Sequence, residues 1–238
     1  EIAQCLVGSE MCIRDRLLYV AVVYRAGIKI GVLTPDHILL FIGVYILLTG
    51  VYMLYYPNFT SLTTMIRDGK LDMYLVKPVA AQFLVTMQRL DLSLLVPDAA
   101  AGIVMIGIGW HRAGLPVTVA SIAGFLFFLI CGALLTYSLF LLPHLLVFWT
   151  TATNGIADLT AAVWDFNNMP QLIYGKWMQR IGTFLLPVFV ITNFPGLFLM
   201  GELSVPMAVW GVAAPIVFFL IARAVWNQAV KNYTSAST

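Results

Sequence analysis

Apolar runs of about 20 residues recur along the chain, separated by shorter polar stretches. A run of that length lets a helix cross the hydrocarbon core of a bilayer, whereas a spanning β-strand would alternate apolar and polar positions. The pattern therefore predicts an all-α polytopic membrane protein with six transmembrane helices. The predicted spans are 17–24 (the end of a truncated first helix), 38–56, 92–110, 119–149, 175–191 and 204–226.

Prolines interrupt several of these runs. Pro57 is expected to end the second span, and Pro143 with His144 to kink or end the fourth near the membrane surface, because a proline removes a helical donor. Pro187 and Pro195 break the fifth apolar region. Broken helices at membrane depth need protein or a water-filled cavity around them. We therefore expect a fifth span to about residue 191 and a re-entrant element before the sixth span.

The stretch 154–168 has a different pattern, typical of an amphipathic helix. Its apolar residues recur at helical spacing, and its polar residues lie elsewhere on the wheel: Ile156, Leu159, Val163 and Phe166 against Asp158, Asp165 and Asn167. We expect either a helix lying at the membrane interface or a spanning helix extended into water.

Composition agrees with lipid as the solvent for most of the chain. Of the 238 residues, 61% are hydrophobic and only 10% are charged, whereas soluble domains carry about 25% charged residues. A net charge of +2 is too small to indicate a nucleic-acid partner. The lipid bilayer is therefore the first partner that the sequence predicts.

Lysines and arginines divide unequally between the two sides of the predicted topology. One side receives eight: Arg67, Lys70, Lys77, Arg89, Lys176, Arg180, Arg223 and Lys231. The other receives three: Arg25, Lys29 and Arg112. Because cytoplasmic loops are rich in these residues, we expect the 58–78 loop, the 154–180 segment and the polar tail 231–238 in the cytoplasm. The expected location is the inner membrane of a bacterial cell.

Residues 5–16 resemble the in-frame translation of a sequencing-library adapter. We therefore expect residues 1–16 to be an artefact and exclude them from the fold prediction; the alternative is a native cytosolic tail. Two of the three cysteines, Cys5 and Cys12, fall in this leader. Cys131 stands alone in an apolar run, and His37, His111 and His144 share no ligand spacing, so neither a disulfide framework nor a metal site is expected.

The most polar internal stretch contains IRDGKLDMYLVKP at residues 66–78. Leu71, Tyr74 and Leu75 fall at i, i+3 and i+4, and would form one apolar face for a partner groove or the headgroup region. Gly69 permits a turn before this short helix, and Pro78 would end it. The alternative is an ordinary connector whose basic residues serve only to orient the protein.

Three motifs resemble those of ABC type-2 exporter permeases of the six-helix subfamily. The first, I-x-x-G-x-L-D-x-x-L-x-x-P, falls at residues 66–78, after the second predicted span. The second is F-x-x-x-P-x-x-x-Y at residues 166–174, and the third comprises Leu-Pro at 186–187, Asn-Phe-Pro at 193–195 and Leu-Met-Gly at 199–201. The resemblance covers residues 17–230 as one transmembrane domain. Its structural motif residues are Phe166, Pro170, Tyr174, Pro187, Asn193, Pro195 and Gly201.

The resemblance implies a permease subunit of an ATP-binding-cassette exporter. Its partners would be a separate ATPase subunit and a second permease copy or paralogue, with substrate passing between the two permeases. ATP and magnesium would be bound by the ATPase, since this chain lacks a G-x-x-x-x-G-K-S/T phosphate loop and is not expected to be an enzyme. The resemblance also implies an ATPase-coupling loop formed by Ile66, Arg67, Asp68, Gly69, Lys70, Leu71, Asp72, Tyr74, Leu75, Lys77 and Pro78.

Asp98 supports a rival function. It lies inside the third predicted span, and intramembrane carboxylates are costly and usually functional. The chain could thus be a proton-coupled secondary transporter that uses Asp98, although a hydrated carboxylate near the interface, paired with Arg89, is an alternative. A third function class is a membrane scaffold protein without transport activity.

Overall fold

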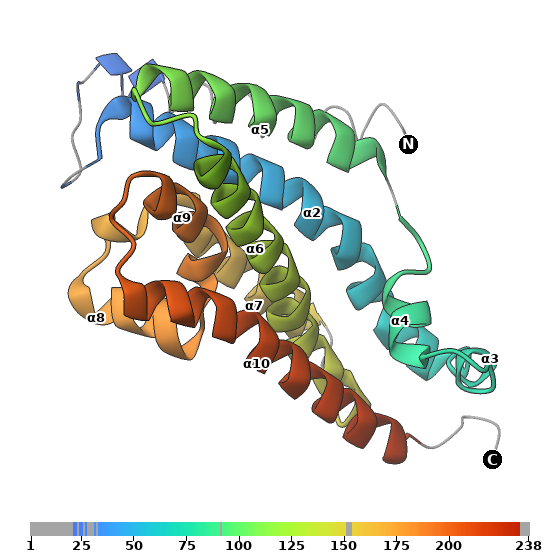
Figure 1. The fold of residues 1–238 in the computed structure, drawn as a ribbon. Coiled ribbons are helices and arrows are strands. Elements are labelled where there is room, and N and C mark those ends of the chain that lie inside the picture. The colour runs from blue at the N-terminus through green and yellow to red at the C-terminus, as the bar shows by residue number, and fades with distance from the viewer. Residues whose placement is uncertain are drawn as a thin grey trace.

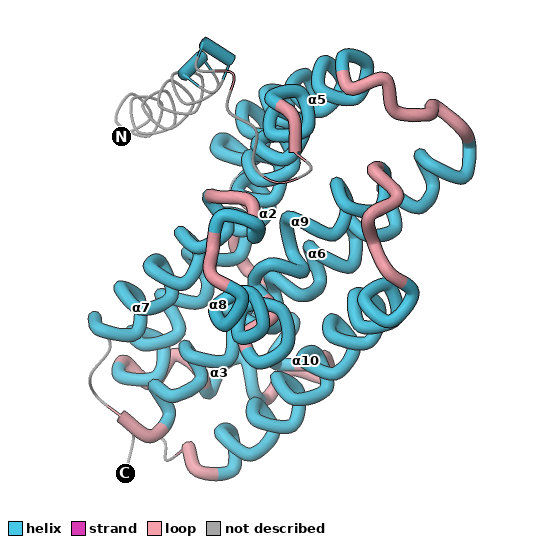
Figure 2. The backbone as a smooth tube through the Cα atoms, turned by 90° about the vertical axis from the view of Figure 1, so that its left-hand side faces the viewer, coloured by secondary structure: helices cyan, strands magenta, loops and turns pink. Residues whose placement is uncertain are grey.

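The computed structural model describes residues 21, 22, 24, 25, 27, 31, 33–90, 92–150 and 154–233. The predicted leader and most of the truncated first span lie outside these residues. Every long element in the described part is a helix (Figures 1 and 2). The helices are α2 (Pro35–Arg67), α3 (Asp72–Leu75), α4 (Ala81–Thr86), α5 (Leu92–Arg112), α6 (Val119–Leu145), α7 (Asn154–Asp165), α8 (Lys176–Arg180), α9 (Val188–Leu199) and α10 (Val205–Lys231).

The start of α2 is capped and tied to neighbouring segments. The Thr34 hydroxyl accepts from the backbone N–H of His37, and His37 Nδ1 accepts from the N–H of Thr34, which together form a capping box. Asp36, in the first turn, accepts a hydrogen bond from the Tyr24 hydroxyl and pairs with Arg112 at 3.3 Å. The first turn of α2 is thereby joined to the last turn of α5.

Helices α2 and α5 lie side by side with their backbones in contact (Figure 1). A Cβ atom at Gly43 would lie 2.8 Å from the backbone nitrogen of Ile106, and one at Gly102 would lie 2.8 Å from the carbonyl oxygen of Gly43. At Gly109 the distance would be 2.7 Å to the backbone nitrogen of Leu40. Small residues permit this approach between helices in membranes. Glycine is therefore required at these three positions for the observed packing.

Helix α2 continues through Pro57, so the prediction that this proline ends it was wrong. The helix runs ten residues further because Phe59, Leu62 and Met65 keep the buried face in register beyond the proline. Pro57 itself is on the exposed side, and the Thr60 hydroxyl donates to the Pro57 carbonyl at 3.1 Å. A proline is tolerated inside a helix where side chains compensate for the altered backbone bonding.

Helix α6 packs against α2, α9 and α10 and ends at Leu145, followed by a 3-10 turn, Leu146–Phe148. The end falls two residues after Pro143, as the sequence predicted. On its α9 side, Gly132 approaches the carbonyl oxygen of Ile191 so closely that a Cβ atom would lie 2.7 Å from it. The α6–α9 contact is thus also made backbone to backbone.

The segment 154–173 crosses the bundle from one end to the other. It begins near the 3-10 turn Leu146–Phe148, where the Phe148 ring lies 5.9 Å from that of Trp226 in the last turns of α10. It ends at Leu172, which lines a small cavity together with His37 in the first turn of α2. The expectation that the 154–180 segment stays on the cytoplasmic side was therefore wrong.

The buried face of α7 also differs from the predicted one. Trp164 stacks on Tyr52 of α2 with ring centroids 4.3 Å apart. Leu159 and Phe166, expected on the apolar face, are exposed. The buried side chains of this segment include Ile156, Thr160, Trp164 and Asn167. Because α7 packs against protein, its polar side chains can be buried with partners.

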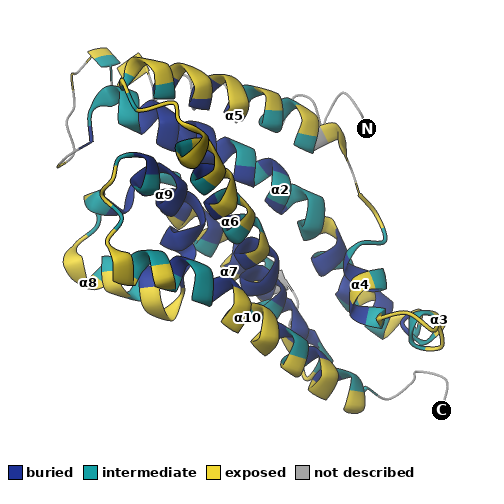
Figure 3. Cartoon of the chain, viewed as in Figure 1, coloured by how far each residue is buried: buried dark blue, intermediate teal, exposed yellow. Residues whose placement is uncertain are grey.

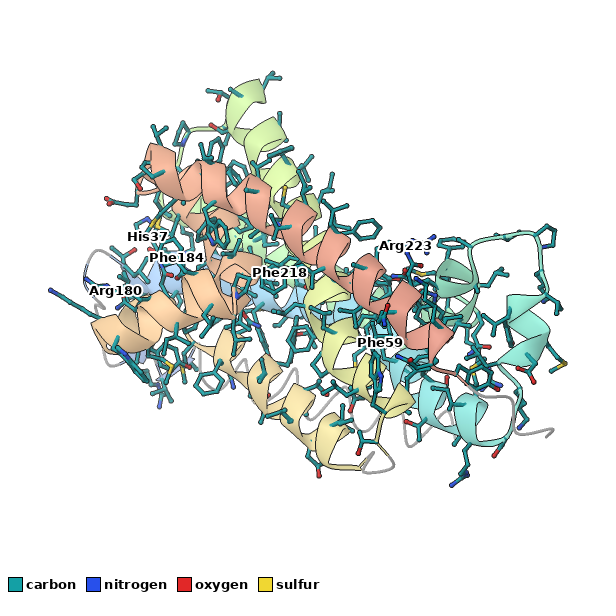
Figure 4. The ribbon with its side chains drawn as sticks, turned by 90° about the horizontal axis from the view of Figure 1, so that it is seen from below. His37, Phe59, Arg180, Phe184, Phe218 and Arg223 are labelled. Carbon is teal, nitrogen blue, oxygen red and sulfur yellow. The ribbon has the colours of Figure 1, made fainter. Side chains whose placement is uncertain are left out.

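The predicted fifth span, 175–191, is broken at Pro187. Residues Lys176–Leu185, which comprise α8 and a π-helical turn, are bent by 100° relative to Val188–Leu199. The two helices lie together at the end of the bundle where α2 begins, and Figure 4 shows Arg180 at the same end as His37. The bent pair, which is either a broken span or a re-entrant loop, therefore begins at Lys176 and lies at the opposite end of the bundle from the 66–78 loop.

This arrangement changes the distribution of basic residues. The end where α2 and α10 terminate holds Arg67, Lys70, Lys77, Arg89, Arg223 and Lys231, and the opposite end holds Arg25, Arg112, Lys176 and Arg180. Lys29 lies outside the described residues. Six against four keeps the sign of the predicted bias but weakens it.

Three helical stretches in the described part of the chain are long and apolar enough to cross a membrane: Pro35–Arg67, Val119–Phe148 and Val205–Lys231. The bent pair Lys176–Leu185 and Val188–Leu199 would be a fourth if counted as one span. Helix α5 agrees in its bounds with the predicted third span. The outer faces of α5 and α10 carry exposed side chains, many of them apolar (Figure 3). The chain is thus an all-α protein of the multi-pass membrane class.

Candidate coupling loop and the cavity beside it

The loop 68–80 connects α2 to α4 at the end of the bundle where α10 also ends (Figure 1). Gly69 ends α2 with a φ of +68°, a conformation that glycine adopts without strain. The N–H of Gly69 donates to the carbonyl of Ile66, and the N–H of Leu71 donates to that of Met65. These bonds turn the chain back toward the body of the protein directly after the helix.

The charged side chains at the start of the loop pair with one another. Arg67 and Lys70 lie 3.5 Å and 3.0 Å from the Asp68 carboxylate. The hydrogen bond from Lys70 is the main reason why the pKa of Asp68 is lowered. All three side chains are exposed, and such surface pairs contribute little to stability. They leave the outer rim of the loop hydrated and charged.

The predicted docking face points into the protein. Leu71 is 0% exposed, and Tyr74 and Leu75 are half-buried against the same apolar core. The Tyr74 hydroxyl donates to Gln88 Oε1 at 2.8 Å. Helical spacing identified one apolar face correctly, but it did not indicate that this face would pack on the core of the same chain.

The side chains that the loop does expose form a different surface. Met73, Val76 and Val79 are 61%, 83% and 54% exposed, and Lys77 lies beside them with its Nζ over the Tyr74 ring. We name these four residues the outer loop surface. Met73, Val76 and Val79 are three positions apart, a spacing in the sequence that could have indicated this surface. The i, i+3, i+4 pattern of the buried face was the stronger signal.

The loop is anchored to both α2 and α10. Gln88 Nε2 donates to Ser61 Oγ at 3.4 Å, and Asn58 Nδ2 donates to the Arg89 carbonyl at 2.8 Å. Burial and the neighbouring Asp72 carboxylate raise the pKa of Tyr233, which follows the last turn of α10. The loop and the segment after α4 are therefore connected to α2 and to the end of α10.

A cavity of about 370 Å³ lies directly behind the loop. Helices α2, α4, α6 and α10 all contribute to its wall. We name it the Arg223 cavity, and it is lined by Tyr55, Ala80, Gln82, Phe83, Met87, Leu134, Tyr137, Phe219 and Arg223. Figure 4 shows Arg223 at the same end of the bundle as Phe59, far from Arg180.

Four polar side chains from three helices are linked at this cavity. Gln82 Nε2 donates to the Tyr137 hydroxyl at 3.3 Å, and Thr86 shares a hydrogen bond of 3.0 Å with the same hydroxyl. Arg223 Nη1 donates to Gln82 Oε1 at 3.2 Å. Gln82, Thr86 and Tyr137 are buried. Sequence reasoning missed the cavity and used Arg223 only as a marker of orientation, although an arginine within an apolar run was the available signal.

Asp98 lies in the contact between α5 and α2. A Cβ atom at Gly50 would meet that of Asp98 at 3.1 Å, so the carboxylate group projects from the helix–helix contact. The ion pairs among the described side chains are those of Asp68 and Asp36, so the alternative in which Asp98 pairs with Arg89 is not observed there. Asp98 is half-buried.

The second motif brings Phe166 and Tyr174 together. Their rings lie 5.9 Å apart, and the Tyr174 hydroxyl donates to the Phe166 carbonyl at 3.3 Å. Between them, Pro170 is buried and directly precedes the 3-10 turn Gln171–Ile173. The motif thus stabilises the turn through which the chain enters the bent pair formed by α8 and α9.

The third motif holds that turn from the other side. Asn193 Oδ1 accepts from the backbone N–H of Gln171 at 2.9 Å. Pro187 stands at the 100° bend and Pro195 inside α9. Gly201 follows α9 with a φ of +71°. These motif residues therefore have a structural part in the arrangement, joining the crossing segment to α9.

The comparisons agree with this architecture. A family model described as "ABC-2 family transporter protein" matches residues 11–237, a range that begins inside the predicted leader. Comparison with curated proteins and with solved structures found no match. The matched range includes the loop, the helices around the Arg223 cavity and the bent pair formed by α8 and α9.

Proposed function

The chain belongs to the ABC-2 family of transporters, and from that membership we propose that it is the permease subunit of an exporter. Family membership implies partnership with an ABC ATPase subunit in general. In our proposal the ATPase is a separate polypeptide that binds ATP and magnesium, while this chain provides the path through the membrane.

The observation that carries the proposal is the outer loop surface. Large apolar side chains that project into water from a charged loop are typical of interaction sites. Burying one such side chain contributes about 1.5–3 kcal/mol. We assign Met73, Val76 and Val79 as the apolar contacts of the ATPase, with Lys77 and the exposed Arg67 as flanking charges.

The anchoring of the loop supports its role in transmission. Displacement of a freely mobile connector would not reach the transmembrane helices. Here Leu71 is buried in the core, and Gln88 joins the loop to α2. Force applied at Val76 would therefore move α2 and α4 together.

Six passes with a revised fifth span complete the proposed topology. The passes are the first helix, largely outside the described residues, then α2, α5, α6, the segment 154–173 and α10. The α8–α9 pair would fold back on the outer side, and the loop and the end of α10 would lie in the cytoplasm. A second permease copy or paralogue would pack on the exposed apolar surface.

The experiment replaces two apolar residues of the outer loop surface by aspartate, Met73→Asp/Val76→Asp. The ATPase should no longer co-purify, and substrate-stimulated ATP hydrolysis in reconstituted vesicles should be lost. The matched control is Val117→Asp/Val119→Asp, an equally exposed pair at the opposite end of the bundle, which should retain both properties. If the loop variant retains both while remaining inserted, the outer loop surface is not the coupling site.

A further inference from the structure

Arg223 brings a cation to the cavity, and no carboxylate among the described residues forms an ion pair with it. The four helices around it include a single acidic residue, Asp36, which is in the first turn of α2. Asp36 precedes the lining residue Tyr55 by 19 positions, about 28 Å along the helix. In the adjoining loop, Asp68 is already paired with Arg67 and Lys70, and Asp72 interacts with Tyr233. Within the described part of the chain, Arg223 has no carboxylate at ion-pair distance.

The arginine is directed toward the cavity wall. Arg223 donates a hydrogen bond to Gln82 Oε1, which is a neutral acceptor. This bond uses one of the five guanidinium donors. Gln82 is in turn fixed by Tyr137. A guanidinium that only reached for lipid headgroups at the outer surface would not need this inward, buried partner. Arg223 is thus oriented for an anion.

The rest of the wall is apolar. Leu134 and Phe219 come from α6 and α10, and Phe83 is an exposed phenylalanine on α4. Arg223 is 18 residues beyond Val205, about 27 Å along α10, which is close to the roughly 30 Å thickness of the hydrocarbon core. The cation therefore stands near a membrane boundary, with the apolar wall extending into the hydrocarbon layer.

We propose that the Arg223 cavity binds an anionic amphiphile from the membrane leaflet on the loop side. The acidic headgroup would accept from Arg223, with Gln82 beside it, and the apolar chain would lie along Leu134 and Phe219. A volume of about 370 Å³ accommodates a headgroup and part of a chain, with the remainder in the bilayer. This binding goes beyond the exporter proposal and does not depend on an ATPase partner.

The position of the site also connects it to the loop. Ala80 and Gln82 line the cavity and immediately follow the outer loop surface along the chain. Movement of the loop would shift the hydrogen bond between Gln82 and Arg223. An occupant of the cavity would therefore respond to the same displacement that the loop transmits.

The test compares binding of phosphatidylglycerol and phosphatidylcholine to the purified full-length chain in detergent, by native mass spectrometry and by the shift in Tm. Charge-assisted hydrogen bonds to Arg223 should favour the anionic lipid by about tenfold. Arg223→Gln should abolish the preference, and Arg223→Lys should retain part of it. Lys231→Gln, an exposed cation on the same helix, is the matched control and should leave the preference unchanged.

A second variant separates the site from general effects on folding. Leu134→Trp keeps every charge but fills the cavity, and it should lower binding of the anionic lipid. Equal binding of both lipids by the unaltered chain, or equal loss in Lys231→Gln and Arg223→Gln, would overturn the proposal. If inorganic phosphate competed as well as phosphatidylglycerol, the site would bind a small anion and the amphiphile would be excluded.

Discussion

The two ends of the bundle differ in how their polar side chains are paired, although both expose apolar side chains, such as Val76 at one end and Trp177 at the other. At the end with α8 and α9, buried polar groups bond to one another: Asn193 accepts from Gln171, and Thr192 donates to Asn167, while Asn167 Nδ2 has no partner among the described residues. At the loop end, Val76 projects into solvent and Arg223 has only a neutral partner. The first end thus links buried polar side chains between α9 and the segment 154–173, whereas the second places a guanidinium beside a cavity where a ligand could bind.

The largest expected effect concerns which end is cytoplasmic. Lys176 on α8 and Lys231 on α10 are both exposed and lie at opposite ends of the bundle. The test compares Lys176→Cys with Lys231→Cys. In a background with the native cysteines replaced, a membrane-impermeant thiol reagent should label Lys176→Cys in intact cells. Lys231→Cys should be labelled only after permeabilisation. Labelling of both from the same side would contradict the crossing by 154–173.

The end with α8 and α9 should be sensitive to loss of one internal hydrogen bond. Asn193→Leu leaves the buried N–H of Gln171 without its acceptor, which costs about 1–3 kcal/mol. The Tm in detergent should therefore fall, while co-purification of the ATPase from folded protein is retained. Glu202→Leu, an exposed polar residue at the same end, should change the free energy of unfolding by about 0.5 kcal/mol or less. An unchanged Tm in Asn193→Leu would show that this end does not depend on the contact.

The smallest effect tests the contact between the loop and α10. Because burial and Asp72 raise the pKa of Tyr233, its phenolate should form above the usual value near 10. A group whose folded pKa is raised contributes stability below its unfolded pKa, and this stability is lost as pH rises through the folded pKa. Asp72→Asn should lower the pKa of Tyr233 toward its usual value. The measurement is the phenolate absorbance difference between each protein and its Tyr233→Phe counterpart. If Tyr233 titrates identically in the unaltered protein and in Asp72→Asn, the loop does not contact the end of α10 through Asp72.

Uninterrupted apolar runs were the part of the fold that could be predicted. The bounds of α5, α6 and α10 differ from the expected spans by a few residues because each run is long and flanked by polar residues. The segment 154–173, which we propose as the fifth pass, could not be found in this way. It carries buried polar residues such as Thr160 and Asn167, which are tolerated because protein surrounds them. Hydropathy therefore favoured the neighbouring apolar region, which is bent at Pro187.

The candidate site was predicted at the level of the segment and not of the side chains. The motif at 66–78 identified the loop, but whether Leu71 or Val76 faces solvent depends on how the loop folds back on Met65. The Arg223 cavity depends on four helices that are distant in sequence. Only the tertiary contacts bring Gln82 to Arg223, 141 positions away.

The glycine contacts between α2 and α5 have a mechanical consequence. Side chains that interdigitate at a helix pair can exchange partners as the helices slide, but backbones in direct contact at Gly43 and Gly102 leave no room for such shear. We therefore expect α2 and α5 to move as one rigid unit. The segment between them, which contains the loop and α4, would transmit a displacement to this unit. Opening of the protein would then rotate the α2–α5 unit relative to α6 and α10. The Arg223 cavity lies between these two groups of helices, since α2, α6 and α10 all line it.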